Sequence, residues 1–152
     1  MLQSSSHSAR RVGVAAAAVL GASIAASPTE SAAFGGYQWK KRPLIIFAPA
    51  NDTAAWLQQR TLLTSRRRGL RERDMVVIAV LGDRVTTLVG RGPGRSAAAL
   101  RRRFGVDKDR FRVLLVGKDG GVKLASSAPV STKRLFGLID SMPMRRREMR
   151  GG

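Results

Sequence analysis

The sequence predicts an α/β fold in which a mixed sheet of four or five strands is flanked by helices. Two uninterrupted apolar segments, 44–48 and 75–81, are typical of strands that are covered on both faces. The segment between them has helical character, so together the three predict a right-handed βαβ unit with parallel strands. Further along, Asp119-Gly120 lies between two more strand-like segments and predicts an antiparallel hairpin, because Asp-Gly tolerates the positive φ of a tight turn.

The βαβ unit has recognisable boundaries. Pro43 and Pro49 bound its first strand, and Asp52 then stands where a helix N-cap is expected. We expect the helix to run from 53 to about 67, with arginines in its last turn and Gly69 as its C-cap. Side chains expected to contact the core are those of Trp56, Leu57, Leu62 and Leu63. Those expected to face water are Gln58, Gln59 and Arg60.

Two more elements follow the βαβ unit. Segment 85–89 is a candidate for a short edge strand. Ser96 is then a suitable N-cap for a helix ending at Phe104, with the arginines at 101–103 mostly on its solvent face.

The last part of the chain predicts the hairpin and a final helix. Strands are expected at 111–116 and 122–126. A helix begins near Ser131 or Thr132, presents apolar side chains at helical spacing and is expected to end at Pro143. The order βαβ followed by αββα is that of a thioredoxin-like domain, which we assign to 34–144, with 145–152 as a basic C-terminal tail.

Residues 1–33 are predicted to be a secretory signal peptide. Arg10 and Arg11 precede an apolar run of 15 residues, 12–26, which is shorter than the roughly 20 residues that span a bilayer as a helix. Small side chains favour cleavage after Ala33, with Ala25 as the second choice. The alternatives are an uncleaved anchor or a buried helix. We therefore expect the mature domain in the periplasm or outside the cell.

The charge is strongly positive. The formal net charge is +18, and it becomes +17 without 1–33 because Arg10, Arg11 and Glu30 are lost. Such an excess favours anionic partners, although the compositional drift of a GC-rich genome towards arginine is an equally open explanation. Specific single-strand nucleic-acid binding is not indicated, because Trp39, Trp56 and Phe104 are better explained by packing than by base stacking.

The residue types present exclude most kinds of catalysis. There is no cysteine, and His7 in the predicted signal peptide is the single histidine. Thiol redox chemistry, Ser-His and Cys-His pairs and zinc clusters are therefore unavailable, and we expect no metal, no cofactor and no catalytic residue. In a thioredoxin-like protein the thiolate would lie in the loop that here contains Pro49, Asn51 and Asp52, a degenerate active-site loop. A carboxylate-based or cofactor-based enzyme at this loop is the alternative hypothesis.

Four stretches together resemble a known family: 39–49, 72–78, 113–124 and 135–149, the last reading Leu-Phe-Gly-Leu-Ile-Asp-Ser-Met-Pro-Met-Arg-Arg-Arg-Glu-Met. They are similar to the bacterial family known as domain of unknown function 4174, whose related domains occur in extracellular-matrix proteins of vertebrates. The resemblance implies a thioredoxin- or peroxiredoxin-like fold. It implies no established activity and no catalytic residues.

Two groups of residues are candidates for binding anions. Arg91, Arg95 and Ser96 belong to a Gly-rich loop that enters a helix, where backbone amides can hold a phosphate or sulfate; a plain connector is the alternative. Arg145, Arg146 and Arg147 lie in the basic tail and suit bidentate contacts with oxyanions. The sequence thus favours a non-catalytic binding module for a protein or an anionic envelope polymer, with a membrane surface as a further possible partner. It sets no oligomeric state.

Overall fold

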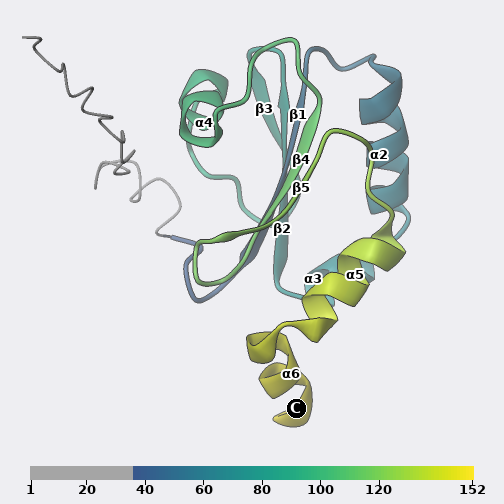
Figure 1. Cartoon of the computed structure of the whole chain (residues 1–152), viewed down its shortest axis with the longest axis vertical. Coiled ribbons are helices and arrows are strands. Elements are labelled where there is room, and N and C mark those ends of the chain that lie inside the picture. The colour runs from purple at the N-terminus through teal and green to yellow at the C-terminus, as the bar shows by residue number, and fades with distance from the viewer. Residues whose placement is uncertain (1–35) are drawn as a thin grey trace, which may run out of the picture.

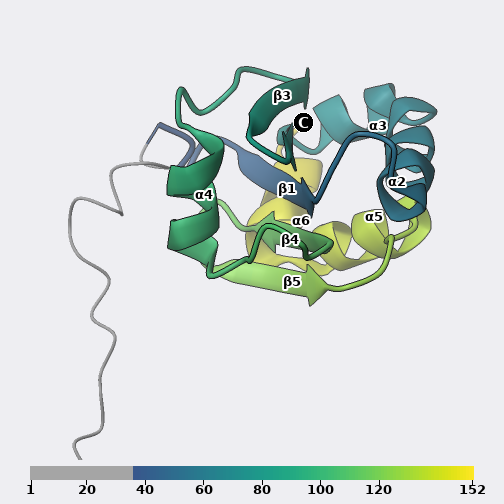
Figure 2. The ribbon, with the colours of Figure 1, turned by 90° about the horizontal axis from the view of Figure 1, so that it is seen from above.

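A computed structural model of the chain describes residues 36–152, and the predicted signal peptide lies outside them. The domain is a mixed five-stranded sheet with helices on both faces (Figures 1 and 2). The strands are β1 (Arg42–Ala48), β2 (Met75–Leu81), β3 (Arg84–Val89), β4 (Arg112–Val116) and β5 (Val122–Ser126). The helices are α2 (Ala54–Thr64), α3 (Arg67–Glu72), α4 (Ala97–Phe104), α5 (Thr132–Ser141) and α6 (Pro143–Arg150).

The sheet order is β3-β2-β1-β4-β5, so the first strand lies at the centre. β1 pairs in parallel with β2 and antiparallel with β4, and every residue of β1 is buried. β3 and β5 are antiparallel edge strands. The predicted βαβ unit, edge strand and hairpin are confirmed, and this α/β arrangement is compatible with a thioredoxin-like fold.

Alternation along β1 divides the core between the two faces of the sheet. Leu44 and Ile46 pack in the cluster that α2, α3 and α5 complete, whereas Ile45 and Phe47 pack in the cluster that α4 completes. Figure 2 shows α4 alone on its side of the sheet. Each such side chain stabilises the fold by about 1.5–3 kcal/mol when it leaves water, which explains the continuous apolar runs.

The helical segment after β1 differs from the prediction. It divides into α2 and α3, and Gly69 lies inside α3 rather than capping a single long helix. Thr53, not Asp52, occupies the N-cap position of α2, and no side chain caps that end. Gln59 was expected in water but is 0% exposed. Its side-chain amide donates to the Val130 carbonyl and accepts from the Val130 N–H. Two buried hydrogen bonds therefore join α2 to the segment before α5.

Helix α4 has the predicted bounds, and the Ser96 hydroxyl accepts a hydrogen bond from the Ala99 N–H as its cap. The prediction was wrong for Arg101, which was expected on the solvent face and is only 6% exposed. Its guanidinium donates to the backbone carbonyls of Ala48, Gly82 and Asp107. Tertiary partners, not periodicity, therefore decide the position of this charge.

The C-terminal residues are helical, not an extended tail. Helix α5 begins at Thr132, where its start was predicted, and the Ser131 hydroxyl caps it by accepting a hydrogen bond from the Arg134 N–H. Pro143, expected to end helical structure, is instead the first residue of α6. Proline is favoured at this position because the first N–H of a helix needs no intrahelical partner.

Candidate functional site: the basic end of the sheet

The loop after β1 has none of the geometry that the enzyme hypothesis needs. Asn51 and Asp52 are exposed, Pro49 is half-buried, and the Asp52 carboxylate does not cap α2. Within the loop, the Thr53 hydroxyl donates locally to the Ala50 carbonyl. The loop therefore brings no acid–base pair and no nucleophile together.

The opposite end of the sheet is where charged side chains meet. We call it the basic end: the end at which β1 and β2 begin and β3 and β4 finish. Helix α6 lies beside it, far from the loop after β1 (Figure 1). Glu148 of α6 is the centre of its ion pairs, with Oε1 accepting from Arg42 Nη2 at 3.1 Å and from Lys118 Nζ at 2.6 Å. Arg42 is 1% exposed, so this carboxylate neutralises a buried guanidinium.

A second carboxylate continues the network toward α5. Asp140 accepts two hydrogen bonds from Arg73, at 3.0 Å and 2.7 Å, and one from Arg145 at 3.4 Å. Arg145 also reaches Glu148 at 3.4 Å. Helix α6 buries none of its residues fully, so these ion pairs are among the contacts that hold it against the domain.

The pKa values follow from this network. Burial alone would raise the pKa of Glu148, but hydrogen bonds from Arg42 and Lys118 and their charges outweigh it and lower the pKa from 4.5 to about 2. Burial also tends to raise the pKa of Asp140, but the hydrogen bond and the charge of Arg73 outweigh burial, so the pKa of Asp140 is lowered. The pKa of Asp74 is lowered in the same way, chiefly by Lys118. All three groups are therefore charged at neutral pH.

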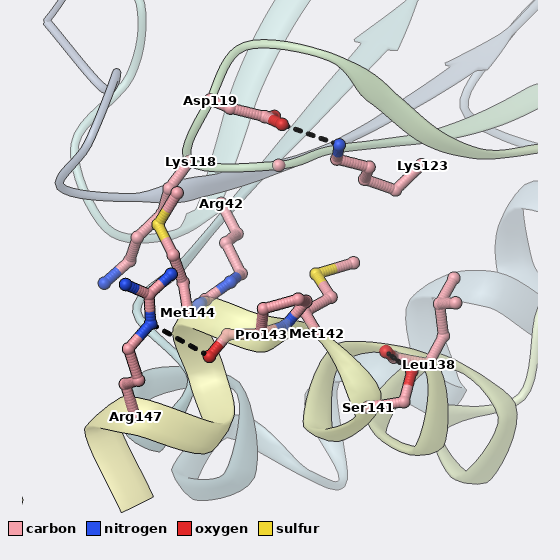
Figure 3. A pocket seen from close by; sticks show the side chains of 11 residues that line it. Arg42, Lys118, Asp119, Lys123, Leu138, Ser141, Met142, Pro143, Met144 and Arg147 are labelled. Carbon is pink, nitrogen blue, oxygen red and sulfur yellow. Dashed lines mark hydrogen bonds and ion pairs between the residues drawn. The ribbon is translucent and has the colours of Figure 1, made fainter.

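A pocket of about 450 Å³ opens between α6 and the β4–β5 hairpin (Figure 3). Cationic side chains from both sides line it, and Met142, Pro143 and Met144 form an apolar wall. Lys123 in this pocket is paired with Asp119 at 2.7 Å, and the Arg147 Nε–H donates to the Pro143 carbonyl. The lining cations are Arg42, Lys118, Lys123 and Arg147. Most of their charge is already neutralised by Glu148, Asp74 and Asp119.

A second pocket at the basic end, of about 320 Å³, has a different charge balance. We call it the Arg91 pocket. Its wall contains the cations Lys40, Lys41, Arg71 and Arg91 together with Tyr37, and its floor is made by Met75, Val76 and Val89. No carboxylate is among its lining residues in the part of the chain that is described.

The predicted anion-binding residues are not brought together. Arg91 lies in the Arg91 pocket, whereas Ser96 uses its hydroxyl to cap α4 and Arg95 is exposed beside it. Of the three tail arginines, Arg145 pairs with carboxylates and Arg146 and Arg147 are exposed. Sequence reasoning missed Lys40, Lys41 and Arg71 as neighbours of Arg91, because they come from segments that become adjacent only through the sheet register.

Two further observations restrict the chemistry. Within residues 36–152, no group of three or more acidic or histidine side chains could hold a metal ion. Over the same residues, no helix is both long and apolar enough to cross a bilayer. One aromatic prediction was wrong: Trp39, assigned to packing, is 62% exposed, whereas Trp56 is buried.

Fold and site together define a cysteine-free α/β domain with a cationic end and no catalytic constellation among the described residues. The chain belongs to the family described as Domain of unknown function (DUF4174), whose model matches residues 34–148. It is 32% identical over 130 residues to coiled-coil domain-containing protein 80 of Danio rerio, which covers 74% of this chain and 15% of that protein.

A second group of relatives carries a different name. The chain is 30% identical over 126 residues to the sushi repeat-containing protein SRPX of Rattus norvegicus, covering 80% of this chain and 27% of that protein. The human protein of the same name has the same identity and coverage. The chain thus spans about a quarter or less of the length of these relatives. No solved structure matches it significantly.

Proposed function

We propose that the protein is an exported, non-catalytic binding module for an anionic partner, with an anionic envelope polymer such as lipopolysaccharide as the leading candidate. The observation that carries the proposal is the Arg91 pocket, in which cations gather without a lining carboxylate. The net charge of +17 outside the predicted signal peptide would attract such a polymer over longer distances.

The chemistry of the chain supports binding over catalysis. Cysteine is absent from the whole sequence, so the reaction for which thioredoxin-like domains use their first helix has no thiolate. The Asp52 carboxylate at the corresponding loop is exposed and forms no cap. Neither observation supports a carboxylate-based enzyme at that loop.

Export to the periplasm or the cell exterior is part of the proposal. It is supported by the predicted signal peptide and by the extracellular setting that the family resemblance implies. Expression of the full chain in a Gram-negative host, fractionation and N-terminal sequencing test it. We expect a mature chain that begins at Phe34 in the periplasmic or extracellular fraction; a full-length chain in the cytoplasm would refute export.

The binding function is tested by sedimentation of the purified protein with lipopolysaccharide at increasing salt. Exposed charges are screened within about 8 Å at physiological ionic strength, so the affinity should fall steeply as salt rises. Dextran of similar size is the neutral control and should bind nothing. Affinity that stays constant between low and high salt would exclude the polyanion as partner and leave a protein partner as the remaining form of the hypothesis.

A further inference from the structure

The Arg91 pocket is assembled from three separate segments. The turn before β1 provides Lys40 and Lys41, α3 provides Arg71, and the loop after β3 provides Arg91. The floor between them is apolar and almost fully buried. A ligand in this pocket would therefore meet cations on its sides and side-chain carbon beneath it.

Hydrogen bonds fix two of these segments, the turn before β1 and the loop after β3, relative to each other. The Tyr37 hydroxyl donates to the Arg91 carbonyl, which ties the loop after β3 to the turn before β1. The N–H groups of Lys40 and Lys41 both donate to the Tyr37 carbonyl, and the Trp39 N–H donates to the Lys118 carbonyl at 2.6 Å. The backbone that carries Lys40, Lys41 and Arg91 is therefore already ordered, which reduces the entropic cost of binding a ligand.

The loop carrying Arg91 also needs a glycine. Gly90 has a φ of +80°, and a Cβ at this residue would lie 2.9 Å from Val76 Cγ2. Only glycine lets the backbone approach the floor of the pocket so closely without strain. The position of Arg91 over the floor is therefore set by local sequence.

The charge in the pocket is not balanced within the domain. Lys41 pairs with Asp74 at 3.5 Å, and that carboxylate is shared with Lys118 at 2.9 Å. Lys40, Arg71 and Arg91 make no ion pair with any carboxylate in residues 36–152. By contrast, the cations of the larger pocket beside α6 are mostly paired. Of these two pockets, the Arg91 pocket therefore offers an external anion more cations that have no carboxylate partner.

We propose that the Arg91 pocket binds the phosphate group of a phosphomonoester. This inference rests on the proposed function and names the chemical group that the anionic partner presents. A volume of about 320 Å³ is near the lower limit of small-molecule sites, which suits one charged group and a small part of what carries it. A phosphomonoester and a sulfate ester both offer three terminal oxygens to guanidinium donors, but the phosphomonoester has a charge of about −1.5 to −2 at neutral pH whereas the sulfate ester is singly charged, so a pocket of several cations favours the phosphate.

The test measures binding of glucose 6-phosphate, glucose 6-sulfate and vesicles of phosphatidylcholine with phosphatidic acid to the purified protein at physiological salt. We expect the phosphate to bind at least tenfold more tightly than the sulfate. Its affinity should rise as the pH increases through about 6, because the phosphate loses its second proton there and gains negative charge. If the protein binds the vesicles much more tightly than glucose 6-phosphate, the phosphate in the natural partner belongs to a lipid. If it binds both with equal affinity, the phosphate group alone is sufficient for recognition.

The variant pair separates this site from general charge attraction. Arg71→Gln with Arg91→Gln removes two pocket charges, and Arg146→Gln with Arg150→Gln removes two exposed charges from α6. All four side chains are exposed, so circular dichroism should show unchanged folding. The pocket variant should lose at least tenfold in affinity for glucose 6-phosphate and the α6 variant less than twofold.

The outcomes distinguish the two proposals. Equal losses in both variants, or no phosphate binding by the unmodified protein, would overturn the pocket assignment while salt-dependent binding of lipopolysaccharide persisted. Loss of that lipopolysaccharide binding itself would overturn the proposed function as well.

Discussion

Replacement of Glu148 by glutamine tests whether ion pairs hold α6 to the domain. The carboxylate bonds Arg42 and Lys118, and without it the buried Arg42 guanidinium keeps the Arg73 carbonyl as its remaining side-chain hydrogen-bond acceptor. A pKa lowered from 4.5 to about 2 corresponds to about 3 kcal/mol at neutral pH. Because the Glu148 side chain is 27% exposed, solvent screening reduces this to about 2 kcal/mol.

The assay is thermal and urea unfolding followed by circular dichroism at pH 7. A loss of about 2 kcal/mol in a domain of this size lowers Tm by about 8 °C. Glu72→Gln is the matched control, since Glu72 pairs within α3 with Arg68, which is 95% exposed; it should change stability by less than about 0.5 kcal/mol. If the two variants were equally stable, the network around Glu148 would contribute no more than a surface pair.

The same variant predicts a change in acid unfolding. A carboxyl group with a lowered pKa in the folded state contributes stability that is complete above its unfolded pKa of 4.5 and is lost as the pH falls toward about 2. The unmodified protein should therefore lose stability across that window. Glu148→Gln should lose less there, with the remainder due to Asp74 and Asp140. Parallel stability curves for the two proteins between pH 5 and pH 2 would contradict this assignment.

Three further substitutions, one of them with a matched control, test separate parts of the structure. Gln59→Ala leaves the buried N–H and carbonyl of Val130 without partners, so it should cost about 2–3 kcal/mol in urea unfolding. Gly90→Ala forces a side chain into the contact with Val76 at positive φ and should cost about 2 kcal/mol in the same assay. Arg145→Gln should lower Tm because it breaks pairs with Asp140 and Glu148, whereas Arg146→Gln should leave Tm unchanged; equal Tm values would show that the pairs of Arg145 do not stabilise α6.

The strands could be predicted from sequence because their signal is local. The runs 44–48 and 75–81 are apolar throughout, and only a strand covered on both faces uses such a pattern in so few residues. Ser96 was found as a cap for a similar reason, since a cap bonds an amide three residues away.

The helix faces could not be predicted where a polar side chain has a distant partner. Gln59 is buried because the backbone at Val130, 71 residues later, satisfies its amide. Arg101 is buried because the carbonyls at Ala48 and Gly82 accept its N–H groups. Periodicity assigns both side chains to water, because it contains no information about acceptors from other elements.

Helix α6 was missed because proline has two meanings at a helix boundary. Pro143 was interpreted as the end of a helix, yet it begins the next one, and the arginines after it suggested a solvated tail. One signal was present: Glu148 is a single carboxylate among arginines. An isolated acid in such a run needs a reason, and here the reason is the buried guanidinium of Arg42.

The burial of Arg101 also indicates which end of the sheet is available to bind a partner. Ala48 ends β1 immediately before the loop where a thioredoxin-like protein would hold its thiolate, and Arg101 donates to its carbonyl and to that of Gly82. The Arg101 guanidinium therefore occupies the backbone acceptors next to the loop after β1, and that loop contains no thiol. At the basic end, the Arg91 pocket presents donors from Lys40, Arg71 and Arg91, and these three side chains make no ion pair with a carboxylate of residues 36–152. Cations that line a pocket without a carboxylate are the groups with which an anionic partner can pair.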